Sequence, residues 1–322
     1  MFQAPNWVPY RFRARWDQWR IDRAVSGLAG TRPAPAADPD SADAELFLQV
    51  CRRDLRITPV AVKALLRFGP RLAVTFMDDG TLAEADREWV NTHVPNARWL
   101  ARQIDHPALN AALAARPLLD HLYRRTSYIT SKLLYPILTA RCPRVVVLDT
   151  DTAFFKRPDR LLNWVTGADL TSAYYLHDTQ DPVADVPPEV LAAFDELGKA
   201  VTPPGKTWNR PHTFFNSGLL AFRPADIDLD VAEGYLNWRQ SATAGLKAGR
   251  AAIWFGDWTP EQTSYLCAFA VMDPPPEPFP ADYVIGGATG QTFNHFLRHH
   301  LVKPDSLKRL KQLIRELEPG MH

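Results

Sequence analysis

The chain has 322 residues and a formal net charge of +1, which comes from 37 basic and 36 acidic residues. Both kinds are mixed along the sequence, so no overall electrostatic field attracts the protein to nucleic acid, and we expect no nucleic-acid partner. A chain of this length buries enough apolar surface for one large α/β domain.

The cysteines and the apolar runs indicate the cellular setting. Cys51, Cys142 and Cys267 are far apart, show no metal-ligand spacing and leave one thiol unpaired in any disulfide scheme, which favours a reducing compartment. The first residues lack a cationic segment followed by an apolar core, and no stretch approaches the ~20 apolar residues of a membrane span. We therefore expect a cytoplasmic protein, bound peripherally at most to the inner face of the membrane.

Residues 1–30 form a basic, aromatic arm, in which aromatic residues alternate with five arginines against only two aspartates. Its aromatic residues include Trp7, Tyr10, Phe12, Trp16 and Trp19. Two interpretations are open: the arm contacts an anionic membrane face or a partner, or it is a helix whose aromatic side chains pack on the main domain. A stretch rich in proline and alanine, 31–40, predicts a linker, so that arm and linker together span residues 1–43.

From residue 44 onwards, short apolar runs alternate with helical patterns. The predicted strands are 45–50, 72–77, 98–100 and 144–148. The predicted helices are 59–68 and 82–91, followed by a long helical region that leads to residue 144. Strands that alternate with helices predict crossover connections and a mainly parallel sheet, in which ligands bind at the carboxyl ends of the strands.

The pattern is less regular beyond residue 170. A proline-rich insertion at 178–211 separates two further predicted strands, 170–175 and 219–222. Helices are predicted at 228–245, 260–271 and 305–317. We expect one catalytic domain at 44–304 with a loop-rich second half, followed by a C-terminal helix within 305–322.

Two carboxylates follow the most apolar predicted strand. Residues i and i+2 of an extended segment point to the same side, so Asp149 and Asp151 emerge together where the strand ends. They repel each other unless a cation lies near them, and hard oxygen ligands favour Mg²⁺ or Mn²⁺. Such a metal would neutralise the charge that develops on a diphosphate leaving group. Alternatively, the pair caps the next turn or binds Lys156 and Arg157.

The run Val-Val-Val-Leu-Asp-Thr-Asp-Thr-Ala-Phe-Phe-Lys-Arg-Pro at 145–158 resembles the metal-binding segment of GT-A fold glycosyltransferases. It is most similar to the retaining family 8 group, which includes glycogenin and bacterial galactosyltransferases. Three further blocks resemble that group in the same order: Thr-Ser-Lys-Leu-Leu at 130–134, Phe-Asn-Ser-Gly-Leu-Leu at 215–220 and Glu-Gln-Thr at 261–263.

The resemblance implies a Rossmann-like α/β fold of the GT-A type, with a mainly parallel central sheet flanked by helices. It also implies an enzyme that transfers a sugar from a nucleotide-sugar donor to an acceptor of unknown class: a glycan, a lipid-linked molecule or a protein. Its cofactor would be Mn²⁺ or Mg²⁺, held by Asp149 and Asp151 between the protein and the diphosphate.

The resemblance also implies roles for single residues. Lys132 would contact the donor, and Asn216 and Gly218 would shape the sugar pocket. Gln262 would stabilise or orient the reacting centre, with Glu261 as the nearest alternative nucleophile or base. No carboxylate in these blocks is required to be a nucleophile, and retention through front-side attack is what the resemblance implies.

Asp78-Asp79-Gly80 follows the second strand and resembles the Asp-Asp-Gly of related GT-A enzymes, where a carboxylate accepts the imide hydrogen of uracil. Such an acceptor favours uridine over cytidine, because cytosine has no hydrogen to donate there. A UDP-sugar is therefore the favoured donor. Alternatively, this Asp-Gly pair only forms a turn.

The third metal ligand is a histidine in the family, within a His-x-x-Gly-x-x-Lys-Pro pattern. Residues 294–304 keep the histidine and the Lys-Pro pair but lack the glycine and are two residues longer. His295 is the predicted third ligand, and His299 is its rival. Three tryptophans, Trp208, Trp254 and Trp258, either form an apolar platform for a sugar acceptor or pack in the core.

Two other functions are compatible with parts of the sequence. A phosphohydrolase of the haloacid dehalogenase type would use Asp149 as its nucleophile, with Gly256-Asp257 and Glu261 as its distal acidic motif. The position where that family requires threonine is Ala153, and two strand-helix units precede the motif. The third hypothesis is a non-catalytic protein that binds nucleotide sugars.

Overall fold

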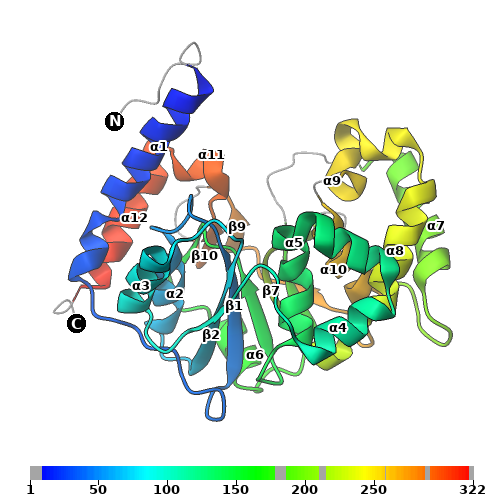
Figure 1. The fold of residues 1–322 in the computed structure, drawn as a ribbon, viewed down its shortest axis with the longest axis horizontal. Helices are drawn as coiled ribbons and strands as arrows, with labels where there is room; N and C mark the ends of the chain where they lie inside the picture. The colour runs from blue at the N-terminus through cyan, green and yellow to red at the C-terminus, as the bar shows by residue number, and fades with distance from the viewer. Residues whose placement is uncertain (1–8, 178–185, 210–214, 258, 287–290, 319–322) are drawn as a thin grey trace.

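The computed structural model describes residues 9–177, 186–209, 215–257, 259–286 and 291–318 (Figure 1). Its main sheet has the strand order β3-β2-β1-β4-β7-β6-β8. The strands are β1 (Ala44–Val50), β2 (Leu72–Asp78), β3 (Arg98–Leu100), β4 (Val145–Leu148), β6 (Ala173–His177), β7 (Phe215–Phe222) and β8 (Glu277–Pro278). Only β7 runs antiparallel to its neighbours in this sheet. The predicted α/β fold with a mainly parallel sheet is confirmed.

Helices cover both faces of this sheet (Figure 1). On one face lie α1 (Tyr10–Ala24), α2 (Thr58–Leu66), α3 (Glu84–His93), α6 (Asp159–Val165), α11 (Leu297–Leu301) and α12 (Pro304–Glu316). On the other lie α4 (Pro107–Ala114), α5 (Pro117–Leu138), α7 (Pro188–Val201), α8 (Leu229–Ser241), α9 (Ala252–Phe255) and α10 (Pro260–Ala270).

The sheet separates two hydrophobic cores, because successive side chains of a strand point to opposite faces. Val146 and Leu148 of β4 belong to one core, whereas Val145 and Val147 belong to the other. All four side chains are fully buried. This explains why the strand before the acidic pair is apolar at every position rather than alternating with polar residues.

A second, small sheet lies beside the end of β4. Its order is β5-β10-β9, with β5 (Thr152–Phe154), β9 (Tyr283–Ile285) and β10 (Phe293–His295). β10 pairs antiparallel with β5, so that His295 lies opposite Thr152. Strands this short gave no alternating pattern in the sequence, and none of the three was predicted.

Most predicted elements before residue 150 are confirmed, but the second half needed corrections. The strand predicted at 170–175 begins only at Ala173, because Asp169 accepts a hydrogen bond from the Thr171 amide and forms a turn there. The predicted insertion at 178–211 contains α7, since a proline in the first turn of a helix costs no hydrogen bond. Residues 178–185 and 210–214 lie outside the described residues.

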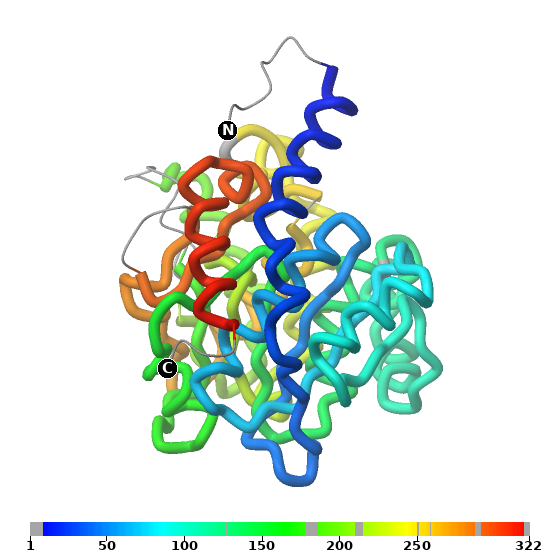
Figure 2. Tube along the Cα trace, turned by 90° about the vertical axis from the view of Figure 1, so that its left-hand side faces the viewer, coloured from blue at the N-terminus to red at the C-terminus, as the bar shows by residue number. Residues whose placement is uncertain are grey.

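The N-terminal segment lies along the body of the protein. α1 packs on α12, and the two run side by side (Figure 2). The predicted linker at 31–40 is hydrogen-bonded to the body: the amides of Ala36 and Ala37 donate to Pro95 and Leu72 carbonyls, at 2.8 Å each. The arm is helical from Tyr10, and the side chains of Tyr10, Phe12, Trp16 and Trp19 are exposed rather than packed on the domain, whereas Trp7 lies outside the described residues. Within the described ranges, no helix has the length and apolarity needed to cross a bilayer.

Candidate active site

Backbone hydrogen bonds position the two acidic residues after β4. The Asp149 amide donates to the Gly218 carbonyl of β7 at 2.9 Å, and the Phe296 amide donates to the Asp151 carbonyl at 2.9 Å. The Thr152 hydroxyl closes the turn by donating to the Asp149 carbonyl at 2.7 Å. Each carboxylate is therefore carried by backbone that is paired with a different, distant segment.

His295 completes a three-residue group with these carboxylates. Its Nε2 lies 3.3 Å from Oδ1 of Asp151 and 3.5 Å from Oδ2 of Asp149. One donor atom from each of the three residues lies within 4.8 Å of the other two. Two carboxylates and one imidazole suit a divalent metal such as Mn²⁺, which accepts both oxygen and nitrogen ligands.

The charges in this group influence one another. Burial by itself would lower the pKa of His295, but the carboxylates of Asp151 and Asp149 raise this pKa above its usual value. Burial would raise the pKa of Asp149, yet Lys132 and His295 hold it below its usual value. A metal ligand must be deprotonated, so a proton on the imidazole competes with a cation for this position.

The structure brings His295, and not its rival His299, to the acidic pair. His299 lies on α11 with its ring 4.2 Å from the ring of His300, and its side chain is exposed. Within the part of the chain that the structure describes, the group that could hold a metal is Asp149, Asp151 and His295. The pairing of β10 with β5 places His295 opposite Thr152 and thereby beside the acidic pair.

Gly218 lies directly beneath the imidazole. A Cβ at this position would come within 2.3 Å of Nδ1 of His295 and within 2.8 Å of Oδ1 of Asn216. The Asn216 oxygen instead accepts a hydrogen bond from the Gly218 amide at 2.8 Å. The Asn-Ser-Gly block therefore has a glycine at the point where only a bare backbone fits under the ring.

Lys132 lies behind the acidic pair. Its Nζ is 2.7 Å from Oδ1 of Asp149, 3.2 Å from the Ser217 hydroxyl and 3.8 Å from Oε1 of Glu261. Burial would lower the pKa of Lys132, but Asp149 and Glu261 raise it above its usual value. The lysine is 7 % exposed and does not line the cleft described below, so its contacts here are with protein carboxylates.

Glu261 and Gln262 lie in the first turn of α10, and their side chains have different surroundings. Glu261 is buried, accepts a hydrogen bond from the Ser217 hydroxyl at 3.3 Å and does not line the cleft. Gln262 does line it, and its Oε1 accepts a hydrogen bond from the Ser217 amide at 3.2 Å. This arrangement favours Gln262 over Glu261 as the side chain that meets a reacting molecule.

A cleft of about 660 Å³ opens over these residues. It is lined by Gln49, Cys51, Arg52, Arg53, Asp54, Asp79, Thr81, Tyr128, Asp149, Thr150, Asp151, Asn216, Gln262, His295 and Leu297. Six of the predicted site residues line it, namely Asp79, Asp149, Asp151, Asn216, Gln262 and His295, whereas Asp78 does not. Arg52 and Arg53 were not predicted as site residues, although they lie two and three residues after the end of β1, and the rule that ligands bind at strand ends would have indicated them. A cavity of about 860 Å³ beside Ser172 and Arg223 contains none of the predicted site residues.

The two aspartates at the end of β2, Asp78 within the strand and Asp79 just after it, have different surroundings. Asp78 is buried and forms an ion pair with Arg87, and one of its oxygens accepts the Gly80 amide at 2.7 Å. Asp79 lines the cleft, and its Oδ1 accepts from the amide and the hydroxyl of Thr81 at 2.9 and 2.6 Å. Asp79 is therefore the one of the pair that can reach a ligand in the cleft.

The predicted tryptophan platform is not assembled in the described residues. Trp254 is buried, and Trp208 packs on the backbone of Gly198, where a Cβ would come within 2.6 Å of its ring. Trp258 lies outside the described residues. The distal acidic motif of a phosphohydrolase is not assembled either, because Asp257 is 94 % exposed and paired with Arg239, while Glu261 lies under Lys132.

No protein-family model and no curated protein matches the sequence. Solved structures do resemble it. The galactosyltransferase LgtC, in complex with donor and acceptor sugar analogues, aligns with a TM-score of 0.50 and 12 % identity over 86 % of this chain and 97 % of its own. Mouse xyloside xylosyltransferase 1 in its apo form aligns with a TM-score of 0.49 and 11 % identity over 80 % and 98 %. The likeness to LgtC shows that the chain has the GT-A fold of nucleotide-sugar glycosyltransferases, as the sequence motifs predicted.

Proposed function

We propose that the protein is a metal-dependent glycosyltransferase that transfers a sugar from a nucleoside-diphosphate sugar to an acceptor. The observation that carries this proposal is the convergence of Asp149, Asp151 and His295 at the carboxyl end of β4, within a cleft of about 660 Å³. A cleft of this volume is in the range that accommodates a nucleotide-sized ligand. The LgtC structure, which shares the fold, was obtained with donor and acceptor sugar analogues.

The chemistry of the three side chains fits Mn²⁺ or Mg²⁺. Nε2 of His295 faces both carboxylates, and the imidazole favours Mn²⁺ over Mg²⁺ because Mg²⁺ prefers oxygen ligands throughout. When bound, the metal would neutralise charge on the diphosphate leaving group. Asp149, Asp151 and His295 are the residues that would hold it.

The other residues of the site would orient the transferred sugar or support the metal ligands. Lys132 neutralises part of the charge of Asp149 from behind, which helps to keep this half-buried carboxylate ionised. Gln262, fixed by the Ser217 amide, presents its side chain to the cleft and would orient the transferred sugar. Asn216 lines the same wall. Glu261, buried beneath Lys132, would support the lysine rather than attack.

The favoured donor is a UDP-sugar. Asp79 lines the cleft after β2 and is the carboxylate that would accept the imide hydrogen of uracil. Uridine diphosphate should therefore bind about 5- to 150-fold more tightly than cytidine diphosphate, since one unsatisfied buried hydrogen bond costs about 1–3 kcal/mol. Equal calorimetric affinities for the two nucleotides would contradict the assignment of uracil recognition to Asp79. The acceptor would be a glycan, a lipid-linked molecule or a protein.

Isothermal titration with uridine diphosphate, with and without Mn²⁺, tests the metal site. We expect binding that depends on Mn²⁺ and is abolished by Asp151→Asn. Asp159→Asn is the matched control, because this aspartate lies on the same segment, is 73 % exposed and pairs with Arg157 outside the cleft. Tight binding that is indifferent to both the metal and Asp151→Asn contradicts the proposal.

Activity assays separate the remaining hypotheses. Turnover of UDP-sugars and release of phosphate from a simple monoester are measured side by side on the same protein. We expect nucleotide-sugar turnover without phosphatase activity. Phosphate release alone would favour a phosphohydrolase with Asp149 as its nucleophile, and nucleotide binding without any turnover would favour a non-catalytic binding protein.

A further inference from the structure

One stripe of α1 exposes aromatic side chains to solvent. Phe12, Trp16 and Trp19 are spaced by four and three residues and are followed four residues later by Arg23, which places all four on one side of the helix. The three aromatic side chains are 49 %, 41 % and 45 % exposed. The rings of Trp16 and Trp19 stack at 4.9 Å, and the guanidinium of Arg23 lies 5.5 Å from the Trp19 ring. We call these four residues the aromatic stripe.

The aromatic stripe is not the face by which α1 joins the protein. The buried residues of the helix are Arg20, Ile21 and Ala24, all in its C-terminal half, and α12 packs there. A surface helix normally buries its apolar side and exposes its charged side. Here large aromatic side chains are exposed on the N-terminal half, which projects beyond the body of the protein (Figures 1 and 2).

Positive charge is concentrated on this part of the molecule. Five arginines and two aspartates give α1 a formal charge of +3, whereas the whole chain carries only +1. Four basic and two acidic residues give the neighbouring α12 a charge of +2. Arg11 and Arg15 flank the aromatic stripe and are exposed. The guanidinium of Arg11 lies 5.0 Å from the Phe12 ring.

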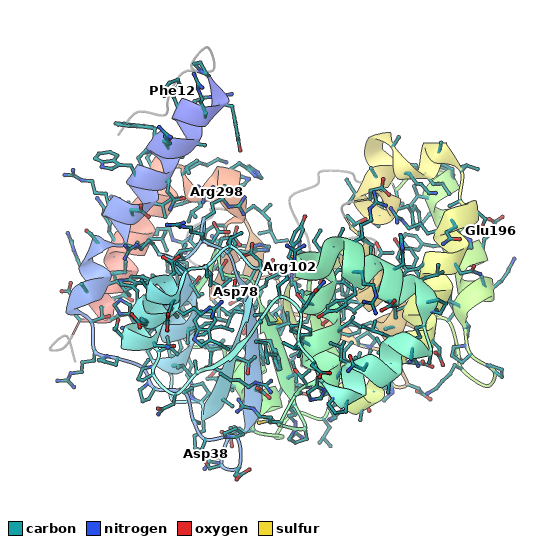
Figure 3. All side chains as sticks on the ribbon, in the orientation of Figure 1. Phe12, Asp38, Asp78, Arg102, Glu196 and Arg298 are labelled. Atoms are coloured by element: carbon teal, nitrogen blue, oxygen red, sulfur yellow. The ribbon has the colours of Figure 1, made fainter. Side chains whose placement is uncertain are left out.

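The helix is tied to the rim of the cleft. Arg298 of α11, three residues after His295, donates to Oε1 of Gln18 on α1 at 2.8 Å and to Oδ1 of Asp54 at 3.1 Å. Asp54 and Leu297 line the cleft. Figure 3 shows Arg298 between Asp78, at the end of β2, and Phe12, near the projecting end of α1. The aromatic stripe therefore has a defined position relative to the site.

We propose that the aromatic stripe of α1 docks on an anionic lipid surface. Tryptophan and arginine together suit the boundary between headgroups and acyl chains, where an aromatic ring is half buried and a guanidinium reaches phosphate. The positive charge of α1 and α12 adds electrostatic attraction to anionic headgroups. A second copy of the chain is disfavoured as the occupant, because two surfaces of charge +3 repel each other.

Docking would hold the cleft beside the membrane. On the proposed glycosyltransferase function, this arrangement fits an acceptor that is anchored in the lipid surface, rather than a freely diffusing glycan. The docking itself depends only on α1 and does not require that the site be active. The two claims can therefore fail separately.

Co-sedimentation of the full-length protein with vesicles tests the docking. One vesicle type is phosphatidylcholine alone, and the other contains about one third phosphatidylglycerol. We expect the wild type to partition preferentially to the anionic vesicles and to be released by salt. Substituting Phe12→Ala, Trp16→Ala and Trp19→Ala together should lower the partition coefficient about tenfold or more. Arg11→Glu with Arg15→Glu should lower it about tenfold on anionic vesicles.

Matched variants control for exposed apolar area and for charge elsewhere. Leu170→Ala removes a 77 % exposed apolar side chain before β6. Arg124→Glu with Lys199→Glu reverses two exposed charges on α5 and α7. Both control variants should bind vesicles as the wild type does. Equal partitioning of the wild type to both vesicle types, or unchanged binding of the triple variant, overturns the proposal. So does a lipid-free dimer that the triple variant dissociates. Uridine diphosphate titrations on the same proteins report separately on the proposed activity.

Discussion

At the scale of single residues, the imidazole of His295 packs against the backbone of β7 at Gly218, so this position leaves no room for a side chain. The ring and the Asn216 side chain occupy the space that a Cβ at Gly218 would need. A glycine in the interior of a strand otherwise weakens it, so its presence here indicates a close approach. The sequence motif contained this glycine, but the reason for it lies in a histidine far along the chain.

We predict that Gly218→Ala displaces the His295 ring and lowers the affinity for Mn²⁺ and for Mn²⁺-dependent uridine diphosphate about ten- to hundred-fold, the usual effect of misplacing a ligand. Titration calorimetry measures both affinities, and circular dichroism checks that the fold is kept. Gly30→Ala is the control, because a Cβ there meets nothing within 4 Å and the backbone is not left-handed. Wild-type metal affinity in Gly218→Ala would show that the ring does not need this space.

Glu261 predicts a pH dependence of stability. Burial raises the pKa of Glu261 from 4.5 to about 7, although Lys132 opposes the shift. Between these pKa values the folded state binds more protons than the unfolded state, so this group's stabilisation is complete below pH 4.5 and is lost as the pH rises to about 7. The loss is on the order of 3 kcal/mol.

Glu261→Gln cannot ionise and should lack this loss. Urea unfolding at about pH 5 and about pH 8 measures the free energy of unfolding of both proteins, and the decrease between the two pH values should be smaller in the variant by that amount. Glu196→Gln, an exposed residue of α7 (Figure 3), should behave as the wild type. An identical pH dependence in Glu261→Gln would show that Glu261 is ionised throughout this range.

At the scale of elements, a buried carboxylate ties the first strands together at the end opposite the site. Glu45 of β1 is fully buried and accepts hydrogen bonds from the Thr75 hydroxyl at 2.5 Å and the Arg141 amide at 2.6 Å. The guanidinium groups of Arg98 and Arg141 lie 3.1 and 3.0 Å from its Oε1. One side chain thereby joins β1 to β2, β3 and the loop before β4.

Glu45→Ala should lower the free energy of unfolding by about 3–5 kcal/mol, because it leaves half-buried guanidinium groups without their carboxylate. Urea denaturation measures the change. Arg71→Ala, which removes an exposed ion pair with Asp43 at the same end of the sheet, should have a much smaller effect because solvent screens such a pair. Similar costs for the two substitutions would mean that the buried network contributes little.

The elements also show how far periodicity predicts structure. β1, β2 and β4 were predicted because each is a largely apolar run, and burial on both faces gives such runs. β3 has only three residues, and their side chains are partly buried. β5 and β10 have three residues each, too few to show a pattern. α7 was hidden by the prolines at its start, although Val190, Phe194 and Leu197 follow a helical spacing.

At the scale of the whole molecule, the two cores do not depend on the projecting half of α1. The buried residues of α1 are Arg20, Ile21 and Ala24, all of which lie beyond this projecting half. Gln18, which accepts a hydrogen bond from Arg298, also lies beyond it. Removing residues 1–16 should therefore change the melting temperature by less than about 3 °C and leave uridine diphosphate binding unchanged. Scanning fluorimetry and calorimetry measure the two. A much larger decrease would show that the N-terminal half of α1 belongs to the folded core.

Local periodicity in the sequence predicted the strand that ends just before Asp149 and Asp151, and with it the edge of the sheet at which these carboxylates emerge. Four placements required the tertiary structure: His295 rather than His299 lies beside the acidic pair, Asp79 rather than Asp78 lines the cleft, Lys132 lies behind Asp149, and the aromatic stripe is exposed. Each depends on which distant segment lies alongside, as when β10 pairs with β5. The local sequence pattern predicts which residues of an element are buried. The side chains that a residue contacts are determined by the pairing and packing of segments that are distant in the sequence.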